Sequence, residues 1–338
     1  MSDAATSTSL APKDYLSCSG CGLCLLVCPV WRRSRDLGLT PLGRAKALQH
    51  GAAVADIAAS IQSCTLCAAC EPVCPEEIGL VAMTLRLRRQ LAQPAAVQSL
   101  RVRMNERAAR PFVPQPWGAA VLLPDRGLRE HPGTLARALV LLGGARNCPI
   151  GEDDGSDIAL ALEAGTAVST QRLERFLRPL RGLKKIVAAD GLLLRYLHRW
   201  LPRSKIVSLG EALSGVTAVR HALGAGDLYV IEPRAYHVDY QRLVKYYDVL
   251  RSATGCTLNL DLQRVAIPAT ARSLPQRLEL EAGVDGADAD NTIQARWILQ
   301  GRKITRLVVE GVEDGVAFQR VSKLPVVHLA DLTDDGTS

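Results

Sequence analysis

Eight of the ten cysteines in this chain of 338 residues fall into two blocks that share one spacing. In each block three cysteines stand three residues apart, a fourth follows four residues later, and a proline comes next. This spacing is typical of bacterial ferredoxins, whose thiolates bind the irons of a 4Fe-4S cluster. Because such a cluster gains or loses one electron, the blocks predict electron-carrying chemistry. They read CSGCGLCLLVCP at residues 18–29 and CTLCAACEPVCP at residues 64–75.

The fourth cysteine of each block lies past a short turn, where it cannot easily reach the cluster bound by the first three. In proteins with two clusters this cysteine binds the other cluster. We therefore predict two 4Fe-4S clusters whose ligands cross between the blocks. The crossing would join the blocks into one folded unit and bring the clusters within reach of electron exchange. The predicted ligands are Cys18, Cys21, Cys24 and Cys74 for the first cluster, and Cys64, Cys67, Cys70 and Cys28 for the second.

Structural zinc and disulfide bonds are the other uses of clustered cysteines. Zinc sites usually take their four ligands as two separated pairs, which is not the spacing found here. The N-terminal stretch MSDAATSTSLAPKDY has no basic start and no apolar segment, so it does not resemble a secretory signal. Disulfides are uncommon in chains that are not exported. The remaining Cys148 and Cys256 are isolated in the sequence, and we expect them to be buried and structural.

The residues between the predicted ligands are small or apolar, which lets backbone N–H groups approach the sulfides and limits water. Glu71 lies beside the second block, whereas Arg32 and Arg33 follow the first. The two clusters can therefore differ in reduction potential, and the sequence assigns neither a value nor a direction to the difference.

Helices are expected around the cysteine blocks. Thr40 and Pro41 form an N-cap followed by proline at the first helical position, and an apolar stripe extends through residues 42–59. A second helix is expected from residue 80 to about residue 91. The cysteine-containing region is therefore predicted to be an α-helical ferredoxin domain rather than the compact, β-rich kind.

The stretch CSGCGLCLLVCPVWRRSRDLGLTPLGRAKAL, followed by CTLCAACEPVCPEEI, resembles the iron–sulfur subunits of the glycolate-oxidase and lactate-utilisation type. It equally resembles the small iron–sulfur subunit of heterodisulfide reductase. In that family a helical two-cluster domain often precedes a cysteine-rich domain of two similar halves, each with a Cys-Cys-Gly signature. The resemblance is specific over residues 18–91 and implies a helical ferredoxin domain over residues 1–110. Beyond that it rests on layout and implies an α/β domain over residues 111–338, with halves at about 118–215 and 226–333.

The second part of the chain contains a repeated unit. KKIVAADGLLLRYLHRWLPRSKIVSLGEAL at residues 184–213 and TRLVVEGVEDGVAFQRVSKLPVVHLADL at residues 305–332 both read as strand, glycine, helix and strand. Gly191 and Gly311 are 120 residues apart, and this offset holds from there onward. A further strand and helix are expected ahead of each unit. Strands that alternate with helices predict an α/β fold with largely parallel sheets.

The second part departs from the family where cysteines are expected. Asp-Asp-Gly at residues 153–155 takes the place of the first signature, Arg234 stands where another cysteine belongs, and residues 267–270 contain none. Carboxylates and guanidinium groups cannot replace thiolates as ligands of a soft iron–sulfur cluster. We therefore expect no further cluster and no disulfide-reducing chemistry there, and interpret this part as a scaffold for docking.

No other strong motif occurs in the second part. It has no G-x-G-x-x-G ahead of a helix, no phosphate-binding loop and no G-x-S-x-G, so no flavin or nicotinamide site of its own is expected. Asp153, Asp154 and Glu232 could bind a hard cation, but acids in such loops are more often solvated turns or helix caps.

The chain carries a formal charge of +7 and only 4% aromatic residues. Seven arginines lie within residues 85–110, with no aromatic residue among them. Nucleic-acid binding usually adds stacking aromatics, so this segment is interpreted as a solvated helix face or a docking surface for an acidic partner. No apolar run approaches the ~18 residues of a membrane span. Together with the missing export signal, this favours a cytoplasmic protein without membrane insertion of its own.

Two intact cluster motifs beside a part without cysteine ligands favour an electron-transfer subunit of a multi-subunit oxidoreductase. It would relay single electrons between a partner, either a catalytic flavoprotein or heterodisulfide-reductase-like subunits, and an acceptor, with no catalytic residue of its own. The alternative is an oxidoreductase with a substrate site in the second part. A redox-sensing regulator that binds nucleic acid is disfavoured because a helix-turn-helix signature is missing. The residues to test for the alternative are Asp153, Asp154, Glu232, Arg234 and His237.

Overall fold

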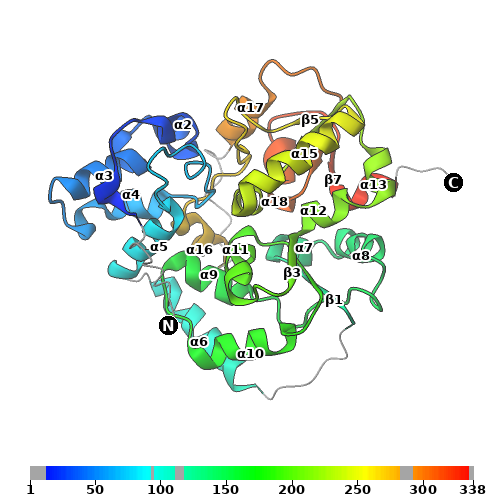
Figure 1. The fold of residues 1–338 in the computed structure, drawn as a ribbon, viewed down its shortest axis with the longest axis horizontal. Helices are drawn as coiled ribbons and strands as arrows, with labels where there is room; N and C mark the ends of the chain where they lie inside the picture. The colour runs from blue at the N-terminus through cyan, green and yellow to red at the C-terminus, as the bar shows by residue number, and fades with distance from the viewer. Residues whose placement is uncertain (1–12, 93–94, 111–117, 282–291, 335–338) are drawn as a thin grey trace, which may run out of the picture.

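The computed structural model describes residues 13–92, 95–110, 118–281 and 292–334. Most of the N-terminal stretch that was predicted not to be a secretory signal lies outside the described residues. The start of the predicted second domain, residues 111–117, also lies outside them. In Figure 1 the helices that carry the cysteines (blue) lie beside two α/β halves, one built on each of two sheets.

Short helices joined by loops form the cysteine-containing region. Thr40 caps α3 as predicted, because its Oγ1 accepts a hydrogen bond from the N–H of Gly43 at 3.1 Å. The expectation of helix throughout residues 42–59 is wrong: Gly51 takes a left-handed conformation (φ 86°) just after α3, and the chain turns before the next helix. The expected helix from residue 80 is present as α5. The elements are η1 (Tyr15–Ser17), α1 (Leu23–Leu26), α2 (Pro29–Ser34), η2 (Leu37–Leu39), α3 (Pro41–Gln49), η3 (Val54–Ile57), α4 (Ala58–Ser63) and α5 (Leu80–Gln90).

The next helix, α6 (Ala95–Ala109), lies against the α/β part. It packs on α9 (Ser156–Ala164) and α10 (Thr170–Leu180), where Leu100 and Met104 are buried. The end of the predicted first domain is therefore in contact with the first half of the second part (Figure 1).

The first half is built on a three-stranded parallel sheet in the order β1-β2-β3. Alternate residues point into two different apolar clusters, so both faces are buried, as expected for a parallel sheet covered by helices on both sides. The strands are β1 (Ala120–Leu123), β2 (Lys185–Ala188) and β3 (Lys205–Ser208). The remaining helices of this half are α7 (Arg126–Glu130), α8 (Pro132–Leu141), α11 (Gly191–Trp200), α12 (Leu209–Ser214) and α13 (Thr217–Ala222).

The second half is built on a four-stranded parallel sheet in the order β5-β4-β6-β7. Its strands are β4 (Asp227–Val230), β5 (Thr257–Leu258), β6 (Arg306–Val309) and β7 (Val326–His328). Its helices are α14 (Pro233–Tyr236), η4 (His237–Asp239), α15 (Tyr240–Thr254), α16 (Leu274–Glu281), α17 (Thr292–Leu299), α18 (Val312–Gln319) and η5 (Leu329–Asp334).

The repeated unit expected from the sequence is present in both halves. β2, α11 and β3 follow one another as β6, α18 and β7 do, and the two strands of each unit are parallel neighbours. A helical ferredoxin-like region followed by α/β halves with parallel sheets confirms the predicted fold class.

One apolar cluster joins the two halves. It contains Val187 and Val207 of the first sheet together with Tyr229 and Val308 of the second. The residues that follow β1, β2, β4 and β6 line one common cavity, so the carboxyl ends of both sheets open toward the same region.

Candidate functional site

Four of the predicted ligands surround one small cavity near the start of the chain. Glycines at positions 20 and 22 take left-handed conformations (φ 86° and 78°), which lets a tight loop turn its cysteines to one side. Two side chains of α3 hold this loop: Lys46 Nζ and Gln49 Nε2 donate to the backbone carbonyl of Cys18 at 3.1 and 2.9 Å. We call this space the first cysteine cavity. Its cysteines are Cys18, Cys21, Cys24 and Cys74.

The other four predicted ligands surround a second small cavity. Leu66 and Ala68, which stand on either side of Cys67, take left-handed conformations (φ 54° and 63°) without being glycine. This conformation is unfavourable for such residues and persists where surrounding structure imposes it. Pro41 and Leu80 line both cavities, which are therefore neighbours. We call this space the second cysteine cavity. Its cysteines are Cys28, Cys64, Cys67 and Cys70.

The fourth cysteine of each block thus lines the cavity of the other block, which is the grouping that the crossed ligation requires. None of the ten cysteines forms a disulfide bond. Four thiols around a cavity suit a cube of iron and sulfide, in which each thiolate binds a different iron. Within the described ranges, no three His, Cys, Asp or Glu side chains converge as the ligands of a single metal ion do. The assignment of each cysteine to a cluster stays a prediction.

Burial raises the pKa of four of these thiols, those of Cys24, Cys28, Cys67 and Cys70. It raises the pKa of Cys24 to about 11 and that of Cys28 to about 12. Cys64 differs, because burial there is outweighed by the positive charges of Arg44 and Arg88, which lower its pKa. Since thiolates are the form that binds iron, cluster binding must release protons, and the pKa of Cys64 favours ionisation at this position.

Two arginines of the helical region are buried beside the second cysteine cavity. Arg44 donates from Nη1 to Thr84 Oγ1 and from Nη2 to the carbonyl of Ser60, both at 2.8 Å. Arg88 donates from Nη2 to the carbonyl of Cys64 at 2.6 Å and from Nη1 to the carbonyl of Glu163 at 2.7 Å. Both side chains are only 1% exposed, so their charges act in a medium that screens them weakly.

Arg234 brings a third buried guanidinium group to this cavity from the second half. Its Nε and Nη2 donate to the carbonyl of Thr65 at 3.1 and 2.5 Å. Its Nη1 and Nη2 also bind the two carboxylate oxygens of Glu163 at 2.8 and 2.9 Å. Arg234 occupies the position where the family resemblance places a cysteine, and here it holds the backbone of the second block instead.

His237 holds the same loop at Cys67, two residues after the contact of Arg234 with Thr65. Its Nε2 accepts a hydrogen bond from the N–H of Ala266 at 3.2 Å, so Nδ1 carries the proton and donates to the carbonyl of Cys67 at 2.7 Å. Burial lowers the pKa of His237 to about 4, which keeps the ring neutral near pH 7. Sequence reasoning named Arg234 as the replacement of a family cysteine and named both Arg234 and His237 as residues to test for substrate chemistry, but it missed their contacts with the cysteine loop.

The acids considered for a hard cation serve structural roles. Arg172 binds both carboxylate oxygens of Asp153 at 2.7 Å, and Arg129 pairs with Asp154. Glu232 caps α14 by accepting hydrogen bonds from two backbone N–H groups. Helix capping was the expected role for such residues, whereas the arginine pairs were not foreseen.

The arginine-rich segment is not uniformly solvated. Arg88 is buried as described, and Arg107 pairs with Asp157 at 3.1 Å. The interpretation of residues 85–110 as a solvated face is therefore wrong for Arg88, whereas the side chain of Arg107 remains 36% exposed. Cys148 and Cys256 lie in the shared apolar cluster, only 3% and 1% exposed, as expected of structural cysteines.

In a comparison with protein families, residues 14–78 match the 4Fe-4S dicluster domain. All eight block cysteines lie inside this span. Neither the curated proteins nor the solved structures contain a match to the chain. The match supports an iron–sulfur protein of the ferredoxin type, with 4Fe-4S clusters bound in the helical region and a role in electron transfer.

Proposed function

We propose that the chain is the electron-transfer iron–sulfur subunit of a multi-subunit oxidoreductase, with two 4Fe-4S clusters bound by the crossed sets of cysteines. The observation that carries this proposal is the grouping of the eight cysteines into two adjacent cavities, each completed by a cysteine of the other block. Each cluster, when bound, supplies one site for a single electron. Two neighbouring sites suit a partner that releases electrons in pairs, such as a flavin or a dithiol.

The residues around the cavities would protect the two clusters from water and hold their loops in place. Apolar side chains line both cavities and limit water at the sulfur atoms. The hydrogen bonds to the carbonyls of Cys18, Cys64 and Cys67 hold the two loops in place. No proton-transfer residue is needed for this role.

A surface beside the first cysteine cavity supports docking to a partner. Cys21 is exposed, and three of the large apolar side chains exposed on the protein surround the first block: Leu16, Leu23 and Leu26 are 70%, 42% and 56% exposed. Exposed apolar side chains near a predicted cluster suit contact with a partner protein. A partner bound there would lie close to the first cluster, and we propose a catalytic flavoprotein or heterodisulfide-reductase-like subunits as that partner.

The place of this complex in the cell is also a proposal. Among the described residues, no helix is both long enough and apolar enough to cross a membrane. We propose a cytoplasmic complex in which the chain itself does not enter the membrane.

Anaerobic purification followed by iron and sulfide analysis and EPR of the dithionite-reduced protein tests the proposal. We expect about eight irons and the spectrum of two interacting clusters, since each cube holds four irons. Four irons, or zinc, would contradict it, and about twelve irons would place a further cluster in the α/β part.

Cys28→Ser tests the crossing. We expect this variant to perturb the cluster held by Cys64, Cys67 and Cys70, because Cys28 lines their cavity. Cys148→Ser, which changes a buried cysteine outside both cavities, serves as the matched control and should leave iron content unchanged. A change in the first cluster alone would mean that each block closes its own cube.

A further inference from the structure

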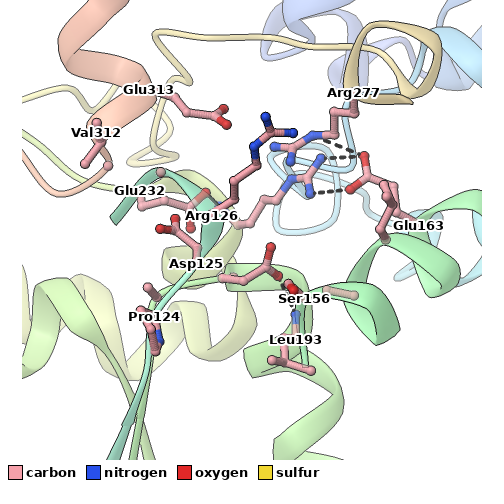
Figure 2. Close-up of a pocket in the computed structure, with 18 of the residues that line it drawn as sticks. Pro124, Asp125, Arg126, Ser156, Glu163, Leu193, Glu232, Arg277, Val312 and Glu313 are labelled. Atoms are coloured by element: carbon pink, nitrogen blue, oxygen red, sulfur yellow. Dashed lines mark hydrogen bonds and ion pairs between the residues drawn. The ribbon is translucent and has the colours of Figure 1, made fainter. Parts of the chain in front are cut away.

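A cavity of about 520 Å³ lies where the carboxyl ends of both parallel sheets meet (Figure 2). Asp125 follows β1, Asp190 follows β2, Glu232 follows β4 and Asp314 follows β6, and all four line it. Ligands of open parallel sheets bind outside the carboxyl ends of the strands, and cavities of this size hold small organic molecules.

The same cavity reaches the cysteine-containing region. Thr65 and Cys67 form part of its lining, and Cys67 also lines the second cysteine cavity. The ion pair of Arg234 with Glu163 stands between the loop of the second block and the cavity, and Arg277 joins it at 3.3 Å from Glu163. A molecule in this cavity would therefore lie beside the loop that is predicted to bind the second cluster.

The lining carries an excess of carboxyl groups, although the chain as a whole is positive. Ten acidic side chains and six arginines line it, and every one of these arginines forms an ion pair with a carboxylate. Four acids of the lining have no ion pair within the described part of the chain; their hydrogen bonds come from backbone N–H groups and from Thr270. These four are Asp125, Asp190, Glu232 and Asp314.

Two of these four acids, Asp125 and Glu232, lie on the same side of the cavity (Figure 2). In Figure 2 Asp125 and Glu232 lie close to each other, while Glu163 and Arg277 lie together on the opposite side. The pKa of Asp125 is raised to about 6, chiefly by burial and also by the nearby charges of Glu313 and Asp190. Burial likewise raises the pKa of Glu232 to about 8. The charges of Arg277 and Arg234 offset burial only in part, and both arginines are paired with Glu163 on the other side of the cavity.

We propose that this cavity binds a small organic molecule with an amine, amidine or guanidine cation, which lies against Asp125, Asp190 and Glu232 while the rest of the molecule extends toward Thr65 and Cys67. An anionic ligand is disfavoured because the arginines are already paired. The inference goes beyond an electron-transfer role, because it gives the chain a ligand of its own at the carboxyl edge of its sheets.

Three probes of similar shape and different charge test the ligand class: benzamidine, benzamide and benzoate. Calorimetric titration of the cluster-loaded protein at about pH 8 should show benzamidine binding at least tenfold more tightly than benzamide, and benzoate no more tightly than benzamide. A preference for benzoate, or no binding of any probe up to about 10 mM, would overturn the proposal.

Asp125→Asn and Glu232→Gln test the position of the cation. Asparagine still caps a helix, so Asp125→Asn removes the charge and keeps the hydrogen bond to Leu128. Each variant should bind benzamidine at least tenfold more weakly. Asp36→Asn is the matched control, because Asp36 caps η2 in the same way outside the cavity. Unchanged affinity in both test variants would place the cation elsewhere and overturn the proposal.

EPR of the reduced protein tests the orientation. Saturating benzamidine should alter the signal of the cluster that Cys28→Ser perturbs and leave the other signal unchanged. If benzamidine bound normally and neither EPR signal changed, the molecule would not lie beside the Cys67 loop, and that part of the proposal would be overturned. Calorimetry measures binding and does not depend on electron transfer. The binding result would therefore stand even if the proposed electron-transfer function failed, and the two failures can be told apart.

Discussion

The two cysteine cavities share one motif and differ in their exposure and in the charges around them. The first lies near the surface, with Cys21 exposed and Lys46 holding the loop. The second is enclosed by Arg44, Arg88 and Arg234, each less than 9% exposed. The difference teaches that the motif determines which cysteines meet, whereas distant parts of the chain determine the charge that surrounds them.

The buried arginines predict which of the two clusters has the higher reduction potential. A reduced cluster carries one more negative charge than an oxidised one, so buried cations stabilise the reduced form and raise the reduction potential. A cation about 6 Å away, at an effective dielectric constant of about 20, contributes about 3 kcal/mol, or roughly 100 mV for one electron. We therefore expect the second cluster to have the higher potential and electrons to move from the exposed first cluster toward it.

Arg88→Met should have the largest effect on this comparison. It should lower the potential of the second cluster by roughly 100 mV and leave the first within about 20 mV, because the lost charge lies beside Cys64. Redox titration followed by EPR measures both. Arg88→Lys keeps the charge and should retain most of the potential.

Lys46→Met is the reciprocal variant, since it removes the cation that contacts Cys18. It should lower the potential of the first cluster and leave the second unchanged. If either variant shifted the reduction potentials of both clusters equally, at normal iron content, the arginines and Lys46 would not act on separate clusters, which would contradict the expectation.

Arg234 and Glu163 should act in opposite directions. Burial disfavours the ionised form of Glu163, but Arg234 and Arg277 outweigh it and lower the pKa to about 2, so the carboxylate is charged at neutral pH. Arg234→Met should lower the potential of the second cluster and Glu163→Gln should raise it, each by roughly 50 mV, because the two charges partly cancel in the native pair.

Redox titration of both variants separates charge from structure. Shifts of the same sign would show that a disturbed loop, and not the charge, moves the potential. Glu174→Gln removes a carboxylate from an exposed ion pair with Arg181 and is the matched control, with no shift expected.

Glu232 should give the smallest effect, visible as a pH dependence. Burial raises its pKa to about 8, so the carboxyl group is neutral below this pH and negative above it. The potential of the second cluster should therefore fall by roughly 20 mV as pH rises from about 6 to about 9, while that of the first stays level. Glu232→Gln should abolish the difference in slope; parallel slopes in the native protein would contradict the expectation.

Sequence patterns predicted the parts of this structure that depend on local spacing. The cysteine intervals predicted the grouping into two sets, and the 120-residue offset predicted the unit of β2, α11 and β3 that recurs as β6, α18 and β7. Both signals arise from residues that are neighbours in the chain or repeat at a fixed interval.

Contacts between remote residues could not be predicted in this way. Arg234 and Thr65 are 169 residues apart, and His237 and Cys67 are 170 apart. Arg88 looked like one of seven arginines on a polar face, and it is buried because α5 packs against both α4 and α9. A charge excess at the edge of two sheets likewise appears only once the strands are placed side by side.

The exchange of the fourth cysteines also bears on how such a region can arise. Neither block completes its own cavity, because Cys28 serves the second and Cys74 serves the first. An isolated block could close its cavity only by pairing with another copy, each copy lending one cysteine to the other. In the helical region the two blocks therefore exchange one cysteine each, as two such copies would, within a single polypeptide.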